Sequence, residues 1–214
     1  MAEGIDRALP FTSEEVLNCL RSHGISFIGR YYKPRKANGD ISDYVLTPEE
    51  ARLISSKRLY IVAVYQDSGT RSSDYNYPKG ANDYSHAMQR AQEIGQPTNT
   101  PIYFAVDYDA AGTETLENVF FYFRGILDRR TWNESLGNPV WPVGVYGSAD
   151  VIDAVVKIFP EIKYKWQTVS WSRGRVTDFN LYQYAIDVGL AVCPGAGKVD
   201  RVRSNGNGGG FLIQ

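Results

Sequence analysis

The sequence predicts an α/β fold, a (β/α)8 TIM-like barrel whose helices are reduced in the C-terminal third. Short and almost continuously apolar runs alternate with longer amphipathic segments, a pattern typical of parallel strands that are covered by helices. Eight strand candidates occur in the 214 residues, centred near Ile5, Phe27, Ile61, Ile102, Val143, Trp166, Tyr182 and Val199. Eight strand–helix units are the number that closes such a barrel.

An open, doubly wound sheet is the structural alternative. Such a sheet usually binds a nucleotide at a glycine-rich first turn, but residues 5–11 (IDRALPF) contain no glycine. Residues 205–210 (NGNGGG) follow the last expected strand and precede no helix, so we interpret them as a flexible turn and not as a phosphate-binding loop. No linker divides the chain, and residues 1–214 are expected to form a single domain.

The first half of the chain alternates strongly. Strands are expected near Ile5 and over residues 26–32 and 59–66. Each is followed by an expected helix, over residues 10–24, 46–58 and 80–95. Thr47 fits a helix N-cap, because Pro48 follows in the first turn and Glu50 completes a capping box. Gly95 fits a helix stop.

The second half begins in the same way and then loses its helices. Strands are expected over residues 101–109 and 140–147, with helices over 113–130 and 148–160. The last third offers three more strands, at 165–171, 180–186 and 198–204, with little helix between them.

The composition of the chain argues against several classes of function. The formal net charge is −1, which argues against nucleic-acid binding and against a polybasic membrane anchor. No apolar run approaches the roughly 20 residues that span a bilayer, and the N-terminus does not resemble a signal peptide. With two cysteines and two isolated histidines, neither a disulfide scaffold nor a metal site is expected, and no cofactor is implied. Barrel closure should bring the first helix near the last strand, so a Cys19–Cys193 bridge stays an open alternative to two free thiols.

Acidic residues occur where expected strands end. Asp107 and Asp109 are two apart, so on a strand their side chains project together, at the barrel end that carries catalytic groups in such folds. Asp6 ends the first strand and Asp200 ends or interrupts the last, so four acids are expected at one mouth. Clustered carboxylates repel, and one of them then keeps a proton, as glycoside hydrolysis requires. The alternatives are that Asp107 and Asp109 cap a loop or helix, or bind a divalent cation.

Other polar and aromatic side chains near the strand ends fit a sugar-binding groove. Gln66 and Gln183 could hydrogen-bond sugar hydroxyls or an acetamido group, while Arg7 and Arg30 could bind a charged group or pair with the carboxylates. The aromatic candidates, each of which could equally pack in the barrel wall, are Tyr32, Tyr65, Tyr146, Trp171 and Tyr182.

Seven segments in order resemble the glycoside-hydrolase-like domain family first catalogued as domain of unknown function 1906, which is distantly similar to glycoside hydrolase family 25 lysozymes. The segments are GIDR, FIGRYY, FAVDYD, GVYGSADVI, WQTVSWS, LYQYA and VDRVRSN. The resemblance implies a flattened barrel that acts on peptidoglycan. It matches Asp6 and Asp200 to the lysozymes' first-strand and last-strand aspartates, Asp107 to the first acid of their aspartate–x–glutamate pair, and places Gln183 near the site. Asp109 stands where the lysozymes carry a glutamate, and is one methylene shorter.

The leading hypothesis is therefore a monomeric glycoside hydrolase, of the lysozyme or muramidase type, that acts on peptidoglycan or a related amino-sugar glycan. Asp109 would donate the proton, Asp107 would stabilise the transition state or orient an acetamido group, and Asp6 and Asp200 would tune the pair. The alternative is a glycan-binding module without turnover on the same fold. A third hypothesis is a toxin or wall-remodelling domain of a larger secreted protein. Either way, an extracellular or cell-wall location is expected, although the N-terminus carries no export sequence.

Overall fold

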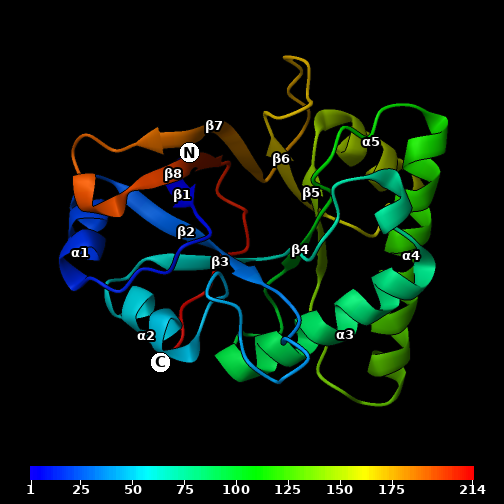
Figure 1. Cartoon of the computed structure of the whole chain (residues 1–214), viewed down its shortest axis with the longest axis horizontal. Helices are drawn as coiled ribbons and strands as arrows, with labels where there is room; N and C mark the ends of the chain where they lie inside the picture. The colour runs from blue at the N-terminus through cyan, green and yellow to red at the C-terminus, as the bar shows by residue number, and fades with distance from the viewer.

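A computed structural model of the chain describes residues 1–214, apart from the side chains of residues 113 and 114. Its eight strands form a closed barrel in sequence order (Figure 1). The strands are β1 (Ala2–Asp6), β2 (Ile25–Tyr32), β3 (Tyr60–Tyr65), β4 (Ile102–Ala105), β5 (Val143–Gly147), β6 (Tyr164–Thr168), β7 (Leu181–Gly189) and β8 (Lys198–Ser204). Every expected strand position lies within one of them, so the predicted barrel class is confirmed.

Helices cover the barrel only as far as the fifth strand. They are α1 (Glu14–Ser22), α2 (Pro48–Ser56), α3 (Tyr77–Ile94), α4 (Thr113–Ser135) and α5 (Ala149–Ile158), with short 3-10 turns η1 (Ser72–Asp74) and η2 (Pro194–Ala196). Beyond α5 the described chain contains no further α-helix, which confirms the predicted loss of helices in the C-terminal third. None of the helices among the described residues has the length and apolar character needed to cross a bilayer.

The N-cap of α2 and the end of α3 are as the sequence predicts, but Glu50 does not complete the capping box, because its carboxylate accepts from the Phe11 backbone N–H at 2.8 Å and pairs with Arg30. The Thr47 hydroxyl accepts a hydrogen bond from the Glu50 backbone N–H at 3.2 Å, with Pro48 in the first turn of α2. Gly95 ends α3 with a φ of 80°, in the left-handed region that glycine tolerates best.

The last strand differs from the parallel sheet that the sequence predicts. β8 runs antiparallel to both β7 and β1, while all other neighbouring strands are parallel. Only residues 190–197 connect β7 to β8, which is too short for a helical crossover, so the chain returns as a hairpin. As a result Asp200, near the start of β8, pairs in register with Asp6 at the end of β1.

Side chains alternate between two apolar regions. One cluster fills the space between the barrel and its helices, and a second lies inside the barrel. The inner cluster contains Phe27, Val62, Val64, Tyr103, Ala105, Trp166, Leu181 and Val202. These positions define which residues of each strand point inward, because successive side chains in a strand face opposite sides.

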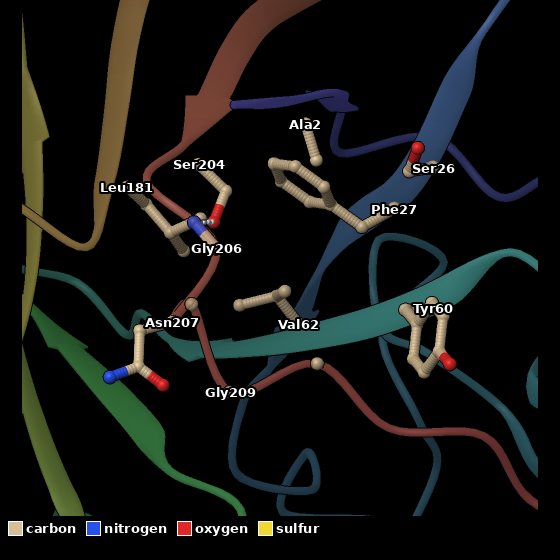
Figure 2. Close-up of a pocket in the computed structure, with 12 residues that line it drawn as sticks. Ala2, Ser26, Phe27, Tyr60, Val62, Leu181, Ser204, Gly206, Asn207 and Gly209 are labelled. Atoms are coloured by element: carbon tan, nitrogen blue, oxygen red, sulfur yellow. Dashed lines mark hydrogen bonds between the residues drawn. The ribbon is translucent and has the colours of Figure 1, made fainter.

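The C-terminal segment closes the N-terminal end of the barrel (Figure 2). Phe211 forms an antiparallel bridge with Ile61 of β3. Gly209 has a φ of 71°, and a Cβ atom there would lie 2.2 Å from Pro101 Cδ, so this position requires glycine. The glycine-rich segment thus packs across the barrel instead of forming the flexible turn that the sequence suggests.

A disulfide joins α1 to the β7–β8 connection. Cys19 and Cys193 are bonded, with their Cα atoms 5.9 Å apart and a sequence separation of 174. The bridged alternative is therefore the correct one, and the bond fastens the hairpin that carries Asp200 to the first helix.

We predict that Gly125→Ala destabilises the fold. A Cβ atom at Gly125 of α4 would lie 2.2 Å from the Tyr77 carbonyl oxygen of α3, so the two helix backbones would have to separate. Overpacking of this kind costs about 1–3 kcal/mol, and it opposes the roughly 1 kcal/mol that alanine gains over glycine in a helix. Urea unfolding measures the difference. Gly189→Ala is the control, because a Cβ atom there meets nothing within 4 Å; equal stabilities of the two variants would contradict the prediction.

Candidate functional site

Each strand contributes one polar side chain to the barrel mouth, from an inward-facing position of the strand or from the residues just after it. We call this set the mouth ring. Its members are Asp6, Tyr31, Gln66, Asp107, Tyr146, Thr168, Gln183 and Asp200. β1 to β6 contribute from their C-terminal ends, whereas Gln183 and Asp200 lie in the first halves of β7 and of the antiparallel β8. The ring thus forms at the end where barrels of this kind carry catalytic groups.

Gln183 is the centre of the ring. Its Nε2 donates to Asp6 Oδ2 at 3.1 Å and to Asp200 Oδ2 at 2.8 Å. Its Oε1 accepts from the Tyr146 hydroxyl at 3.1 Å and from Thr168 Oγ1 at 2.6 Å. These four bonds use the full hydrogen-bonding capacity of the amide. Gln183 therefore positions the carboxylates and has no free group for a sugar hydroxyl, in contrast to the substrate contact that the sequence suggests.

Asp6 is buried at the base of the ring. Its Oδ1 accepts a hydrogen bond from the Tyr31 hydroxyl at 2.9 Å, and the residue is 1% exposed. Burial, and then the neighbouring charge of Asp200, raise the pKa of Asp6 to about 7, against the smaller opposing effects of its hydrogen bonds. The Asp6 carboxyl group therefore stays mostly protonated below about pH 7.

The other two ring carboxylates are more accessible. Asp107 Oδ2 accepts from Gln66 Nε2 at 2.8 Å, and burial raises the pKa of Asp107. Asp200 Oδ1 accepts from the Asp187 backbone N–H at 2.8 Å. Burial also raises the pKa of Asp200, with smaller contributions from the charges of Asp187 and Asp107, while the Asp187 backbone hydrogen bond lowers it. The three carboxyl groups are thus electrostatically linked, and binding a proton at one affects the others.

A cavity of about 370 Å³ opens beside Asp6 and Asp200, with Tyr31 on its wall. The loop after β1 and the β7–β8 hairpin enclose it. A second cavity of about 380 Å³ lies at the opposite end of the barrel, where Phe27, Val62 and the glycine-rich segment line it (Figure 2). That cavity has no carboxylate among its lining residues.

Asp109 does not join the ring, and the predicted group of four acids is wrong at this position. β4 ends at Ala105, so strand alternation does not continue as far as Asp109. The Asp109 side chain is 50% exposed, and both its oxygens lie 2.9 Å from Arg173 Nη2. Arg173 belongs to the loop after β6 and also contacts Asp150. The Asp109 carboxylate therefore takes part in a surface ion-pair network outside the ring, which links the loops after β4 and β6 to the start of α5.

Tyr32 and Tyr65 point out of the barrel, so their prediction as sugar contacts is wrong. Both are fully buried between the barrel and its helices. The Tyr32 hydroxyl donates to Gln96 Oε1 at 2.9 Å, and the Tyr65 hydroxyl donates to Asp83 Oδ1 at 3.3 Å. In a strand, an error of one residue moves a side chain to the opposite face, and the inward positions are the adjacent Tyr31 and Gln66.

The remaining aromatic candidates divide in the same way. The prediction of Tyr182 as a sugar contact is wrong by one residue, because Gln183 is the residue that faces inward. The Tyr182 ring lies outside the barrel, 5.4 Å from the ring of Phe179. Tyr146 lies in the ring, packed edge-on against Trp166. Trp171 is half-buried in the loop after β6, and its contact with substrate stays a prediction.

Sequence reasoning missed two members of the ring. Tyr31 and Thr168 bind the carboxylates or the central amide, yet neither was selected. Counting by twos from the inward-facing Phe27 and Trp166 reaches both of them, so the alternation of each strand carried the necessary information. The sequence alone does not show which residue of a strand faces inward, and the alternation can be used only once one such residue is known.

The two arginines near the mouth are structural. Arg30 is fully buried, pairs with Glu50 at 2.8 Å, and donates to the carbonyl oxygens of Arg7 and Ala8. Arg7 in turn donates to backbone carbonyls, including that of Ala196 in the β7–β8 connection. Arg30 exerts only a minor lowering effect on the pKa of Asp6. Both arginines therefore fix the loop beside the cavity, and neither forms an ion pair with a ring carboxylate.

Comparison with known proteins gives a consistent family and fold. The family model described as the Rv2525c-like, glycoside hydrolase-like domain matches residues 18–203. YbfG of Bacillus subtilis is 31% identical over 152 residues, which are 70% of this chain and 21% of YbfG. The Tat-secreted protein Rv2525c of Mycobacterium tuberculosis, solved with L-tartrate, has a TM-score of 0.75 at 24% identity and covers 98% of both chains. The virulence factor GHIP of Streptococcus pneumoniae, a glycosyl hydrolase 25, has a TM-score of 0.56 at 11% identity, over 96% of this chain and 87% of GHIP.

We predict that Asp6 makes the fold less stable as the pH rises. The folded protein holds the Asp6 proton up to about pH 7, whereas the unfolded chain releases it near pH 3.8. Between these values the folded state binds more protons, so the free energy of unfolding should fall as the pH increases, by on the order of a few kcal/mol. Denaturant unfolding at a series of pH values measures this slope.

Asp6→Asn removes the titrating group and should flatten the slope, leaving the variant more stable relative to the wild type above pH 7. Asp109→Asn is the control, because that carboxylate lies outside the ring. An unchanged slope in Asp6→Asn would show that Asp6 does not carry the proton.

Proposed function

Because this chain belongs to the family of Rv2525c-like, glycoside hydrolase-like domains, we propose that it cleaves a glycosidic bond in peptidoglycan or a related amino-sugar glycan. The observation that carries the proposal is the group of three ring carboxyl groups with raised pKa values, of which Asp6 and Asp200 line an open cavity and Asp107 is partly exposed at the same mouth. Glycoside hydrolysis needs a protonated acid to protonate the leaving oxygen and an ionised carboxylate to stabilise the positive charge that develops on the sugar.

We assign the proton donor to Asp107 instead of Asp109. Burial favours the protonated form of Asp107, and the hydrogen bond from Gln66 engages only Oδ2, which leaves Oδ1 for the substrate. Asp200, which accepts from the Gln183 amide and the Asp187 backbone, is the carboxylate best supported as an anion. Asp6 is too deeply buried to reach a sugar, and its proton sets the charge beside Asp200.

A glycan-binding module without turnover is the second candidate. One observation favours it: the position at which the similar lysozymes carry a glutamate is here Asp109, and its carboxylate is occupied by Arg173 outside the ring. A binding module would use the same cavity, with Tyr31 on its wall, but would not need one carboxyl group protonated and another ionised.

The cellular setting is also a proposal. The chain spans about a fifth of the curated relatives that it matches, 21% of YbfG and 23% of FadG, both of Bacillus subtilis. This supports a role as one wall-acting unit of a larger protein. The Tat-secreted Rv2525c supports export, and hence an extracellular or cell-wall location. A monomer suffices for the proposed reaction, because one chain supplies the whole mouth ring.

We predict that Asp107→Asn lowers the release of reducing ends from purified peptidoglycan by at least about a hundredfold, because it removes the transferable proton. Asp109→Asn should stay within a few-fold of the wild type, since that carboxylate lies outside the ring. Both variants are assayed over a range of pH values by reducing-end release and by the turbidity of cell-wall suspensions, with circular dichroism to confirm folding.

The reverse result, with Asp109→Asn inactive and Asp107→Asn active, would return the proton donor to the position that the sequence suggests. If the wild type releases no reducing ends yet still sediments with the glycan, the binding module is the correct function.

A further inference from the structure

Three groups that can bind a metal lie together on the side of the barrel, apart from the mouth ring. His23 Nδ1 is 3.7 Å from Cys19 Sγ and 3.6 Å from Cys193 Sγ. The three ligand atoms all lie within 4.8 Å of one another. In the present state the two sulfurs are joined as a disulfide.

The fold assembles this cluster from both ends of the chain. Cys19 and His23 are four residues apart at the C-terminal end of α1, so they share one helix face. Cys193 arrives from the β7–β8 connection, which lies against α1 (Figure 1). The expectation that the histidines are isolated overlooked the four-residue spacing, whereas the third ligand becomes apparent only on barrel closure.

We propose that, once the disulfide is reduced, Cys19, Cys193 and His23 form a zinc site. Zinc takes thiolate and imidazole ligands in tetrahedral geometry, with Zn–S near 2.3 Å and Zn–N near 2.0 Å, which places a nitrogen and a sulfur ligand roughly 3.5 Å apart. His23 Nδ1 already has this separation from both sulfurs. The sulfurs themselves must separate to roughly 3.7 Å, the spacing of two thiolates on one zinc ion. Rotation of the two cysteine side chains can accomplish this, because Cys193 lies in a connection and not in a strand.

Reduction of the disulfide is a balanced reaction when a phosphine is the reductant. The phosphine gives two electrons to the S–S bond, takes up the oxygen of one water molecule to become a phosphine oxide, and leaves two thiols. Zinc binding then displaces both thiol protons. His23 Nδ1, which lies 2.9 Å from the Cys19 carbonyl oxygen and so carries the ring hydrogen, must pass that hydrogen to Nε2.

Room exists for a fourth ligand. A cavity of about 190 Å³ borders the cluster, with His23 and Cys193 among its lining residues. Cys19 is partly exposed and His23 is exposed, so both a reductant and the ion can approach from solvent. A water molecule in this cavity would complete a site with three protein ligands.

Disulfide and zinc would serve the same structural purpose. Either one ties α1 to the hairpin whose Asp187 backbone N–H holds Asp200. Such a fastening stabilises the hairpin, because the ladder between its strands β7 and β8 is interrupted at two places. The interruptions lie between Gln183 and Ala185 and between Ala185 and Val188. The zinc site depends on neither the glycan nor the proposed hydrolysis.

The test measures zinc on the intact chain, after removal of any affinity tag. The wild type is reduced with a water-soluble phosphine under argon, checked for folding by circular dichroism, and titrated with zinc against a chromophoric chelator.

We expect one zinc per chain after reduction and less than a tenth of that in the oxidised protein. His23→Ala should bind at least tenfold more weakly, and Cys19→Ser/Cys193→Ser should not bind. His86→Ala, which alters the second histidine of the sequence, should bind as the wild type does.

Cobalt provides an independent readout of geometry. In the reduced wild type it should give thiolate-to-metal charge-transfer absorption and the visible bands of a tetrahedral site, and both should be lost in the double serine variant. The proposal is overturned if the reduced, folded wild type binds no zinc at micromolar concentration, or if His23→Ala binds as tightly as the wild type. Loss of the fold on reduction also overturns it, because the site requires the closed barrel.

Discussion

The antiparallel pairing of β8 with β1 is the constraint on which the mouth depends. It places Asp200 opposite Asp6, two carboxylates separated by almost the whole sequence. Gln183 Nε2 then bonds both, so the two bonded oxygens lie at most about 6 Å apart. A helical crossover before β8 would have reversed that strand and moved Asp200 to the other end of the barrel. The short hairpin connection therefore determines the chemistry as well as the topology.

Burial raises the pKa values of the ring carboxyl groups, and it also opposes the stability of the fold. A carboxylate without full solvation is unfavourable, and the fold responds by raising the pKa of Asp6 and by surrounding the group with donors from Tyr31 and Gln183. A wholly apolar ring would be more stable, but it could not hold and release protons near neutral pH. Such conflict between stability and local chemistry is typical of functional sites. The disulfide fastens α1 to the hairpin that carries Asp200.

Much of the fold was predictable, and the site was predictable in part. Strands such as β3 are marked by β-branched and aromatic residues, and Thr47 and Gly95 mark helix ends through local hydrogen bonding and backbone geometry. Asp6 and Asp107 are predictable because they lie where apolar runs end, at the expected ends of strands. Tyr32 was chosen in place of Tyr31 because the face of a strand cannot be known until one inward residue is fixed.

The sequence by itself determined the eight strands, the loss of helices after α5 and the identity of three ring acids, because local propensity, turn chemistry and apolar periodicity act over a few residues. Only the tertiary structure decided that β8 runs antiparallel, that Asp109 turns to Arg173, and that Cys19 meets Cys193. These outcomes depend on contacts between segments far apart in the chain, and such contacts form only when the barrel closes.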